Sequence, residues 1–192
     1  MTSSESLDLS CYVAGEKTVG PARLNVHSPY HRGLVGTVTL ATRQDTEAAV
    51  RMALTGGEPP TRYERFAILD KARLLLEERR EAFARLIVSE SGLCLRETRY
   101  EVGRALDVLR FAAQEALRDA AIDDPDQYVK EQAVFALSQL PEDEGVPLLI
   151  DVARNNPNAK VREQAIFWLG QSRDAKALKA LQDIILKSPE QE

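Results

Sequence analysis

Cysteine and histidine are among the residue types that could perform nucleophilic or metal chemistry, and the 192 residues contain two of each. Cys94 follows an expected helix stop rather than preceding a recognisable helix start, and no histidine or basic residue can be assigned to activate its thiol. His27 and His31 are four residues apart, but Pro29 between them prevents the helix that would bring both rings to one face. The sequence therefore predicts no catalytic residue, no metal site and no disulfide framework.

A nucleotide coenzyme would require a phosphate-binding segment. Neither a G-x-G-x-x-G pattern after an expected strand nor a phosphate loop occurs in the sequence. We therefore expect no cofactor-binding residue and no bound cofactor.

Composition limits the class of protein. Hydrophobic residues make up 44% of the chain and charged residues 29%, and no run of about 18 apolar residues could span a bilayer. The first ten residues include acidic but no basic side chains, so they lack the basic region and apolar core of a secretory signal. These features predict a cytoplasmic protein without membrane contact.

The composition changes part-way along the chain. Residues 1–120 contain 17 basic and 17 acidic side chains, whereas residues 121–192 contain 8 and 13, so the net charge of -5 lies in the C-terminal part. Fifteen Arg and two Lys precede this point, and three Arg and five Lys follow it. An acidic segment is a poor partner for nucleic acid. We interpret the chain as two pieces, residues 1–119 and residues 120–192.

The first piece is expected to form short strands followed by helices. Strand-forming residues occur in three stretches, at 12–13, 24–26 and 34–40. Thr42 with Asp45, and Thr61 with Glu64, have the spacing of capping boxes and predict helical regions that end at glycines. A further helix is predicted from about 97 to 121. Its apolar stripe consists of Val102, Leu106, Leu109, Ala113 and Leu117.

Short motifs of the first piece resemble one protein family. The motifs are Gly15-Glu16, Ser28-Pro29-Tyr30, Thr61-Arg62-Tyr63-Glu64-Arg65, Glu90-Ser91-Gly92-Leu93-Cys94 and Tyr100-Glu101-Val102-Gly103-Arg104-Ala105. They resemble the N-terminal segment of NAD(P)-dependent aldehyde dehydrogenases. The Ser-Gly-Leu-Cys motif and the sequence of residues 107–117 are most similar to those of phosphonoacetaldehyde dehydrogenases.

This resemblance has consequences for activity. It implies that the coenzyme site, the general-base glutamate and the nucleophilic cysteine all come after such a segment, and that Cys94 is not the nucleophile. Hydride transfer needs an activated thiolate, a base and a dinucleotide crevice. None of these can be assigned in the sequence, so we expect no enzymatic activity.

The second piece contains an internal repeat with an offset of 32 residues. Residues 129–139 (VKEQAVFALSQ) align with residues 161–171 (VREQAIFWLGQ), and Pro125 aligns with Pro157. Each unit is predicted to be a pair of helices, and the pattern resembles bacterial HEAT-like repeats. The residues expected to pack between neighbouring pairs are Ala133, Leu137, Leu149, Val152 and Ala153, and Ala165, Leu169, Leu181, Ile184 and Ile185.

Two repeats are fewer than the roughly three that a stable array needs. The same offset maps Leu149 onto Leu117, so the helix expected near 97–121 stands where a preceding second helix would lie. One interpretation is that this helix caps the solenoid, with Leu109, Ala113 and Leu117 packed on Val129, Ala133 and Leu137. The other is an accidental match, because Leu and Ala are common at helical spacing.

Five residues of the repeats are candidates for protein interaction. Trp168 is the only tryptophan, and it is either a binding hot spot or a residue at the edge of the core. Lys130 with Glu131, and Arg162 with Glu163, occupy corresponding positions of the two repeats. They form either a solvated face or the recognition surface.

These features predict a mostly α chain, in which an N-terminal α+β fragment of short strands and helices precedes an α-solenoid of about two helical-pair repeats. The favoured function is a non-catalytic module that binds another protein, with self-association through exposed apolar helix faces as a further expectation. Two alternatives stay open. One is a dehydrogenase-like protein, completed by another chain, that oxidises phosphonoacetaldehyde or a similar small aldehyde with NAD(P). The other is a chimera without selected function.

Overall fold

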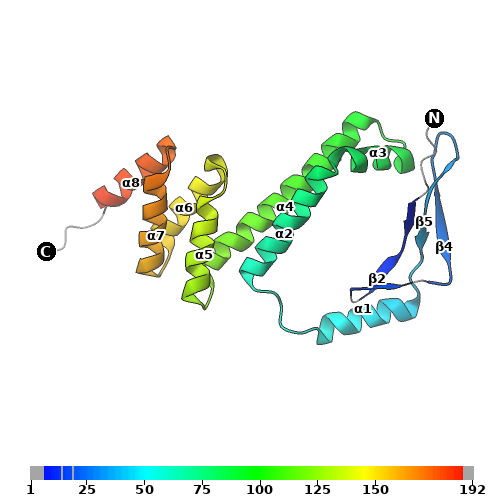
Figure 1. Cartoon of the computed structure of the whole chain (residues 1–192), viewed down its shortest axis with the longest axis horizontal. Coiled ribbons are helices and arrows are strands. Elements are labelled where there is room, and N and C mark those ends of the chain that lie inside the picture. Colours follow the sequence, from blue (N-terminus) through cyan, green and yellow to red (C-terminus); the bar gives the residue numbers. More distant parts are fainter. Residues whose placement is uncertain (1–6, 14, 19, 188–192) are drawn as a thin grey trace. The chain divides into compact units, whose positions relative to one another are not determined.

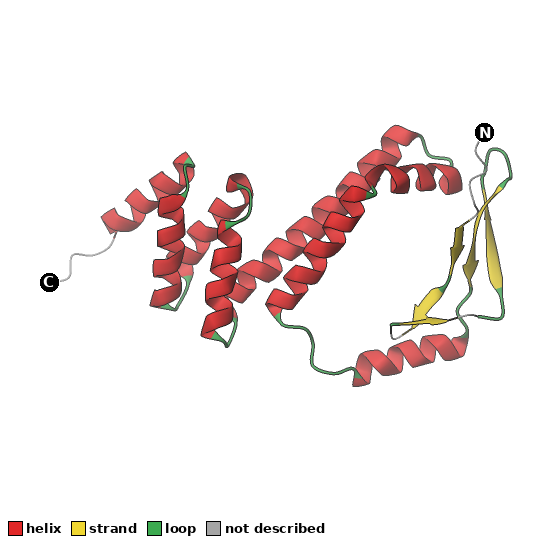
Figure 2. Ribbon diagram, viewed as in Figure 1, coloured by secondary structure: helices red, strands yellow, loops and turns green. Residues whose placement is uncertain are grey.

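Short strands precede the helices in this chain, as Figures 1 and 2 show for the computed structural model. The structure describes residues 7–13, 15–18 and 20–187, which include five strands and eight helices. The predicted mostly α fold is confirmed. The chain divides into two compact units, the first made of residues 1–59 and 75–106 and the second of residues 60–74 and 107–192.

The strands belong to the first unit. β1 (Leu7–Leu9), β5 (Leu34–Thr39) and β4 (Arg23–His27) form a sheet in the order β1-β5-β4, with β1 parallel and β4 antiparallel to β5. β2 (Cys11–Val13) and β3 (Glu16–Thr18) form a separate antiparallel pair. β1 and β3 have only three residues each, too few for the alternation that signals a strand in sequence.

Capping residues define the starts of the first two helices as predicted. Ahead of α1 (Arg43–Thr55), the Thr42 hydroxyl accepts from the Asp45 amide at 3.1 Å, and the Asp45 carboxylate accepts from the Thr42 amide at 2.7 Å. Thr61 and Glu64 make the same exchange ahead of α2 (Arg62–Glu78). Both side chains therefore satisfy amides that have no partner within the helix.

The helical region that begins at Thr61 is interrupted at Arg79. α2 ends at Glu78, and α3 covers Arg80–Ser91. α3 ends at Gly92, whose φ of 76° lies in the left-handed region that glycine adopts without strain. The Gly92 carbonyl accepts a hydrogen bond from the Tyr30 hydroxyl at 2.7 Å, which ties the loop after β4 to the end of α3.

The first unit has a small apolar core. Ala84, Val102 and Leu106 are its buried members, whereas α1 buries no residue at all. Large apolar side chains of this unit are exposed, among them Leu9 at 50% and Leu54 at 81%. Several large apolar side chains of this unit therefore remain accessible.

The second unit contains the helical pairs. α4 (Leu95–Asp123) contributes its residues from 107 onward and precedes two pairs of helices. The pairs are α5 (Gln127–Ser138) with α6 (Glu142–Asn155), and α7 (Ala159–Gln171) with α8 (Ala175–Lys187). α5 lies beside α7 and α6 beside α8, the stacking expected of an α-solenoid (Figure 1).

One continuous core joins α4 to the repeats. Leu117, Ala120 and Ala121 of α4 are fully buried in the same cluster as Leu137 and Leu169. Of the two interpretations of α4, the structure therefore favours the cap. The predicted stripe is partly wrong, because Leu109 and Val129 are only half-buried and lie outside this cluster.

The open side of α8 shows a second difference from the prediction. Ile185 was expected to pack as Ala153 does, but it is 72% exposed whereas Ala153 is 4% exposed. α8 lies against α6 and α7, and the described residues provide no further helix to cover its remaining side. Equivalent positions of a repeat are thus not equally buried.

Candidate functional site

Trp168 lies at the centre of an aromatic patch on α5 and α7. Its ring is 5.4 Å from that of Phe135 and 5.1 Å from that of Phe167, measured between centroids. Trp168 is half-buried and packs against the core, whereas Phe135 is 43% and Phe167 56% exposed. Trp168 therefore supports two exposed aromatic rings.

Sequence reasoning overlooked Phe135 and Phe167, although a signal was present. The two residues are 32 positions apart and hence occupy the same place in successive repeats. A core position would explain the repetition, but both rings are on the surface. Aromatic side chains are enriched at binding hot spots.

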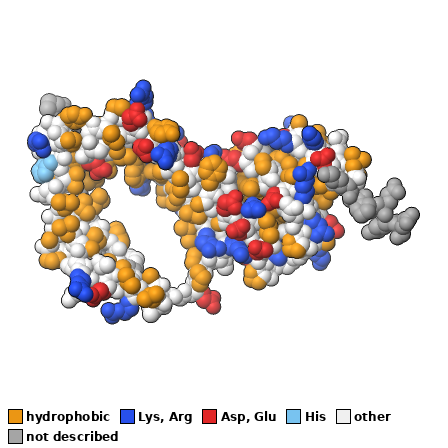
Figure 3. All heavy atoms as spheres, turned by 180° about the vertical axis from the view of Figure 1, so that it is seen from behind, with side chains coloured by type: hydrophobic (Ala, Val, Ile, Leu, Met, Phe, Trp, Pro, Cys, Tyr) orange, Lys and Arg blue, Asp and Glu red, His pale blue; other side chains and the backbone are white. Residues whose placement is uncertain are grey.

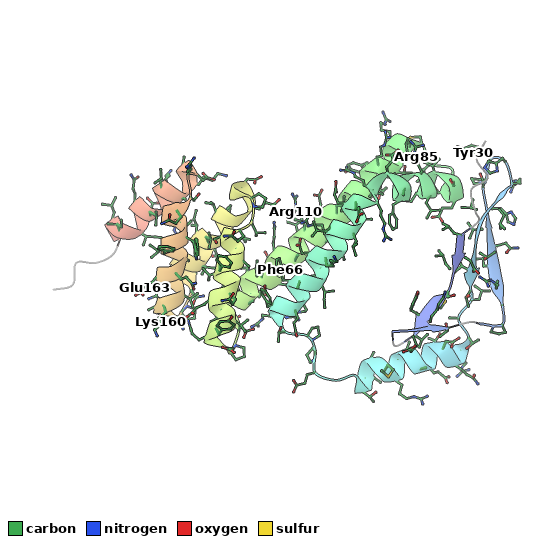
Figure 4. The ribbon with its side chains drawn as sticks, viewed as in Figure 1. Tyr30, Phe66, Arg85, Arg110, Lys160 and Glu163 are labelled. Carbon is green, nitrogen blue, oxygen red and sulfur yellow. The ribbon has the colours of Figure 1, made fainter. Side chains whose placement is uncertain are left out.

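The four predicted charged residues lie on the same two helices but differ in environment. The Glu131 carboxylate accepts from the Gln127 amide at 2.9 Å, and Lys130 is half-buried. Arg162 donates to the carbonyls of Asn156 and Pro157 at 2.8 and 3.1 Å, so its guanidinium holds the turn before α7. Glu163 is the one of the four that is exposed rather than half-buried, and it lies near Lys160 in the first turns of α7 (Figure 4).

A pocket of about 180 Å³ opens beside the aromatic patch, between the ends of α5 and α7 and the start of α6. Leu137, Val146 and Leu149 form its apolar floor. Its rim is polar and uncharged, and consists of Ser138, Gln139, Gln171 and Ser172. Trp168 also lines it. The pocket and the aromatic patch are therefore adjacent features of one surface.

Charged side chains bind α4 to α6 inside the second unit. Arg118 donates to the Asp151 carboxylate at 2.7 Å. Arg110 and Gln114 donate to Glu144 at 3.0 and 2.6 Å, and Figure 4 shows Arg110 on α4. These bonds add a polar connection to the apolar packing of α4 on the repeats.

The Arg118 pair predicts a pH dependence. The hydrogen bond from Arg118 lowers the pKa of the Asp151 carboxyl below its ordinary value of 3.8, although burial acts in the opposite direction. A carboxyl whose pKa is lower in the folded state stabilises the fold above its unfolded pKa, and this contribution disappears as pH falls through the folded value. We expect Asp151→Asn to reduce the loss of thermal stability between about pH 5 and pH 2.

The matched control for that measurement is Asp119→Asn. Asp119 is exposed on α4. Across the same pH range, the melting temperature of Asp119→Asn should change with pH as that of the unchanged protein does. An identical acid profile for both variants would contradict a stabilising role of the Arg118–Asp151 pair.

The residues suited to catalysis belong to the first unit. Cys94 is exposed and directly precedes α4, which corrects the expectation that it does not precede a helix start. The His27 ring lies 3.0 Å from the Arg32 carbonyl, and His31 accepts from the Gly33 amide at 3.1 Å. Within the described ranges, no group of three or more His, Cys, Asp or Glu side chains could hold a metal ion.

None of the described helices is both long enough and apolar enough to cross a bilayer. On the face of the repeats drawn in Figure 3, basic, acidic and hydrophobic side chains are interspersed.

Known proteins match the two pieces separately. The model of the aldehyde dehydrogenase family matches residues 16–136, and a HEAT repeat model matches residues 114–192. An aldehyde-dehydrogenase-like protein of Sinorhizobium fredii is 36% identical over 106 residues, which are 54% of this chain and 21% of that protein. The 3-sulfolactaldehyde dehydrogenase of Priestia megaterium is 36% identical over 110 residues, 56% of this chain and 23% of that enzyme.

A solved structure agrees with these matches. Aldehyde dehydrogenase 21 of Physcomitrella patens superposes with a TM-score of 0.56 and 28% identity, over 60% of this chain and 25% of that one. The chain thus spans about a fifth to a quarter of the length of these relatives. The specific likeness to phosphonoacetaldehyde dehydrogenases stays a prediction. By the match over residues 16–136 the chain belongs to the aldehyde dehydrogenase family, and it carries HEAT repeats over residues 114–192.

Proposed function

We propose that this chain is a non-catalytic protein-interaction module, in which HEAT repeats are mounted on an aldehyde dehydrogenase segment. The observation that carries the proposal is the common core of α4 and the repeats, in which Leu117 is fully buried together with Leu137 and Leu169. This packing gives the repeats a rigid support. Stacked helical repeats present extended surfaces that bind other proteins.

The composition and the family matches bear on where the two pieces join. The matches overlap over residues 114–136, and the change in composition falls near residues 119 and 120. We place the boundary of the two domains there, within α4. A cytoplasmic location and a protein partner, rather than nucleic acid, belong to the same proposal.

The five predicted interaction residues are part of this proposal with different roles. Trp168 supports the exposed rings of Phe135 and Phe167, and Glu163 adds an exposed charge on α7. Lys130 and Glu131 lie on the neighbouring helix α5. Arg162 acts indirectly, because its guanidinium bonds the backbone of the turn before α7.

The experiment has two measurements on the full chain. A photo-reactive benzoylphenylalanine at position 167 should cross-link a partner protein in cells, whereas the same residue at position 111 should not. Phe111 is the matched control because it is an aromatic residue with 58% exposure that lies on α4 rather than on α5 or α7. Purified protein given NAD(P) and phosphonoacetaldehyde or simple aldehydes should form no reduced coenzyme.

The outcomes separate the candidate functions. Coenzyme reduction that disappears in Cys94→Ala would overturn the non-catalytic part of the proposal. Equal cross-linking at positions 111 and 167 would contradict the aromatic patch as the binding surface. The absence of both a cross-link and coenzyme reduction would favour a chimera without selected function.

One observation supports a second candidate, a dehydrogenase completed by another chain. The first unit buries few apolar side chains and exposes Leu7, Leu9 and Leu24 of its sheet at 43%, 50% and 52%. A further polypeptide could cover this surface and supply the cysteine, base and coenzyme crevice. A cross-link from position 24 to a dehydrogenase polypeptide would support this candidate.

The exposed Ile185 and Leu186 of α8 support self-association of the chain.

A further inference from the structure

The pocket beside Trp168 has the size of a site for one side chain. Its volume is about 180 Å³. Sites for drug-sized ligands and cofactors measure about 300 to 1,000 Å³, whereas a cavity of about 150 Å³ holds a molecule as small as benzene. The pocket is therefore too small for a nucleotide coenzyme and large enough for a single aliphatic group.

The lining selects an uncharged group. The floor is apolar, and Leu137, Val146 and Leu149 are each at most 3% exposed. No ionisable side chain lines the pocket, so a charged group that entered it would lose water without gaining a counter-ion. By contrast, the nearby cavity beside Arg110 is lined by Asp70, Arg73 and Glu144, whose charges pair within that cavity.

The rim suits a peptide backbone. Gln139 and Gln171 are 32 residues apart and occupy the same position of successive repeats, so the structure places two amide side chains at one opening. Each amide donates and accepts, as a peptide group does. The Gln139 amide donates only to its neighbour Ser138 at 3.1 Å, and the side chain of Gln171 makes no hydrogen bond to another described residue.

We propose that this pocket binds an extended segment of a partner protein by one uncharged aliphatic side chain, with the flanking backbone held by Gln139 and Gln171. The inference rests on the proposed protein-interaction function and names the chemistry of the partner. The adjacent Phe135 and Phe167 rings would then contact the residues next to the inserted side chain.

The experiment uses the full chain and the fluorescence of Trp168, the only tryptophan, which lines the pocket. The peptide acetyl-Gly-Leu-Gly-amide should give a saturable change, and acetyl-Gly-Lys-Gly-amide should bind at least about tenfold more weakly. Free leucine tests whether the natural ligand is a metabolite. Binding of free leucine as tight as that of the blocked peptide would overturn the assignment to a protein segment.

Two variants and a control complete the test. Val146→Phe should fill the pocket and abolish peptide binding. Gln171→Ala, at an exposed position, should weaken binding about three- to tenfold without affecting folding. Gln132→Ala, on the exposed side of α5 outside the pocket, should leave binding unchanged. Unchanged binding in Gln171→Ala would overturn the proposal even if Val146→Phe did not fold.

The failure of this inference is distinguishable from failure of the proposed function. The partner cross-link from position 167 is measured in the Gln171→Ala chain as well. A persistent cross-link without any peptide binding would reject the pocket and leave the interaction module in place. If the chain with benzoylphenylalanine at position 167 and no other change formed no cross-link, the interaction module itself would be rejected.

Discussion

Leu117→Ala should lower the free energy of unfolding of the repeat unit by about 2 to 5 kcal/mol. Leu117 is fully buried on α4, in one cluster with Ala133, Leu137 and Leu149. Truncation removes its transfer free energy and leaves a cavity that neighbouring side chains fill only in part. Hydrogen exchange of the slowest amides around Leu137 and Leu169 measures this loss in the full chain.

Leu178→Ala is the matched control for that experiment. Leu178 lies on α8 and is 55% exposed, so the same chemical change creates no buried cavity. We expect the control to change exchange by less than about 0.5 kcal/mol. If Leu117→Ala and Leu178→Ala changed hydrogen exchange equally, the burial of Leu117 would not stabilise the repeats. The chimera would then become the leading interpretation.

Local signals in the sequence were sufficient to predict the starts of α1 and α2 and the repeats. Thr42 and Thr61 act through side chains three residues away, so their spacing alone specifies the capping boxes. The offset of 32 residues indicates that one pair of helices occurs twice, and α5 with α6 and α7 with α8 are these two pairs. These are short-range rules, and short-range rules are readable from one sequence.

Features that depend on the neighbours of a residue were not readable. Leu109 continues the apolar stripe of α4, but it lies two turns before Leu117 and remains only half-buried outside the repeat core. Ala113, between them, lines a cavity that also includes Phe66 of α2, a segment far away in the sequence. A periodic stripe specifies one face of a helix but does not specify what covers each part of it.

The candidate site shows the same limit. Arg162 aligns with Lys130 and looks like a surface charge in both repeats, yet its Nη1 donates to the two carbonyls of the turn before α7. The aromatic pair of Phe135 and Phe167 is visible as a repeated residue type. Its exposure, which separates a binding patch from a core position, follows only from the three-dimensional arrangement.

Asn156→Asp should destabilise the repeats by about 2 kcal/mol at neutral pH. Asn156 is 2% exposed, and its side-chain amide donates to the Ala121 carbonyl at the end of α4 at 2.8 Å. An aspartate there replaces the donor by a charged acceptor that faces another acceptor. Its other oxygen would still accept from the Asn158 amide, as the asparagine does at 2.9 Å, so the turn itself is preserved.

The equivalent position of the preceding repeat provides the control. Asp124 accepts from the Asp126 amide at 3.0 Å in the same kind of turn, but no carbonyl contact corresponding to that of Asn156 is present among the described residues. Asp124→Asn therefore keeps the acceptor that the turn uses and should change stability by less than about 0.5 kcal/mol. Comparing Asn156→Asp with Asp124→Asn therefore distinguishes the contribution of the turn from that of the hydrogen bond to α4.

The sign of the pH effect gives this prediction a second readout. Burial against a carbonyl raises the pKa of the new carboxyl at position 156 above its unfolded value, because only the protonated form donates. Stability should therefore be close to that of the unchanged protein below about pH 4 and be lost as pH rises through the folded pKa. Melting temperatures of Asn156→Asp and Asp124→Asn from pH 3 to pH 8 measure it. A constant difference between the two variants over this range would show that Asn156 stabilises the turn rather than the junction between α4 and the repeats.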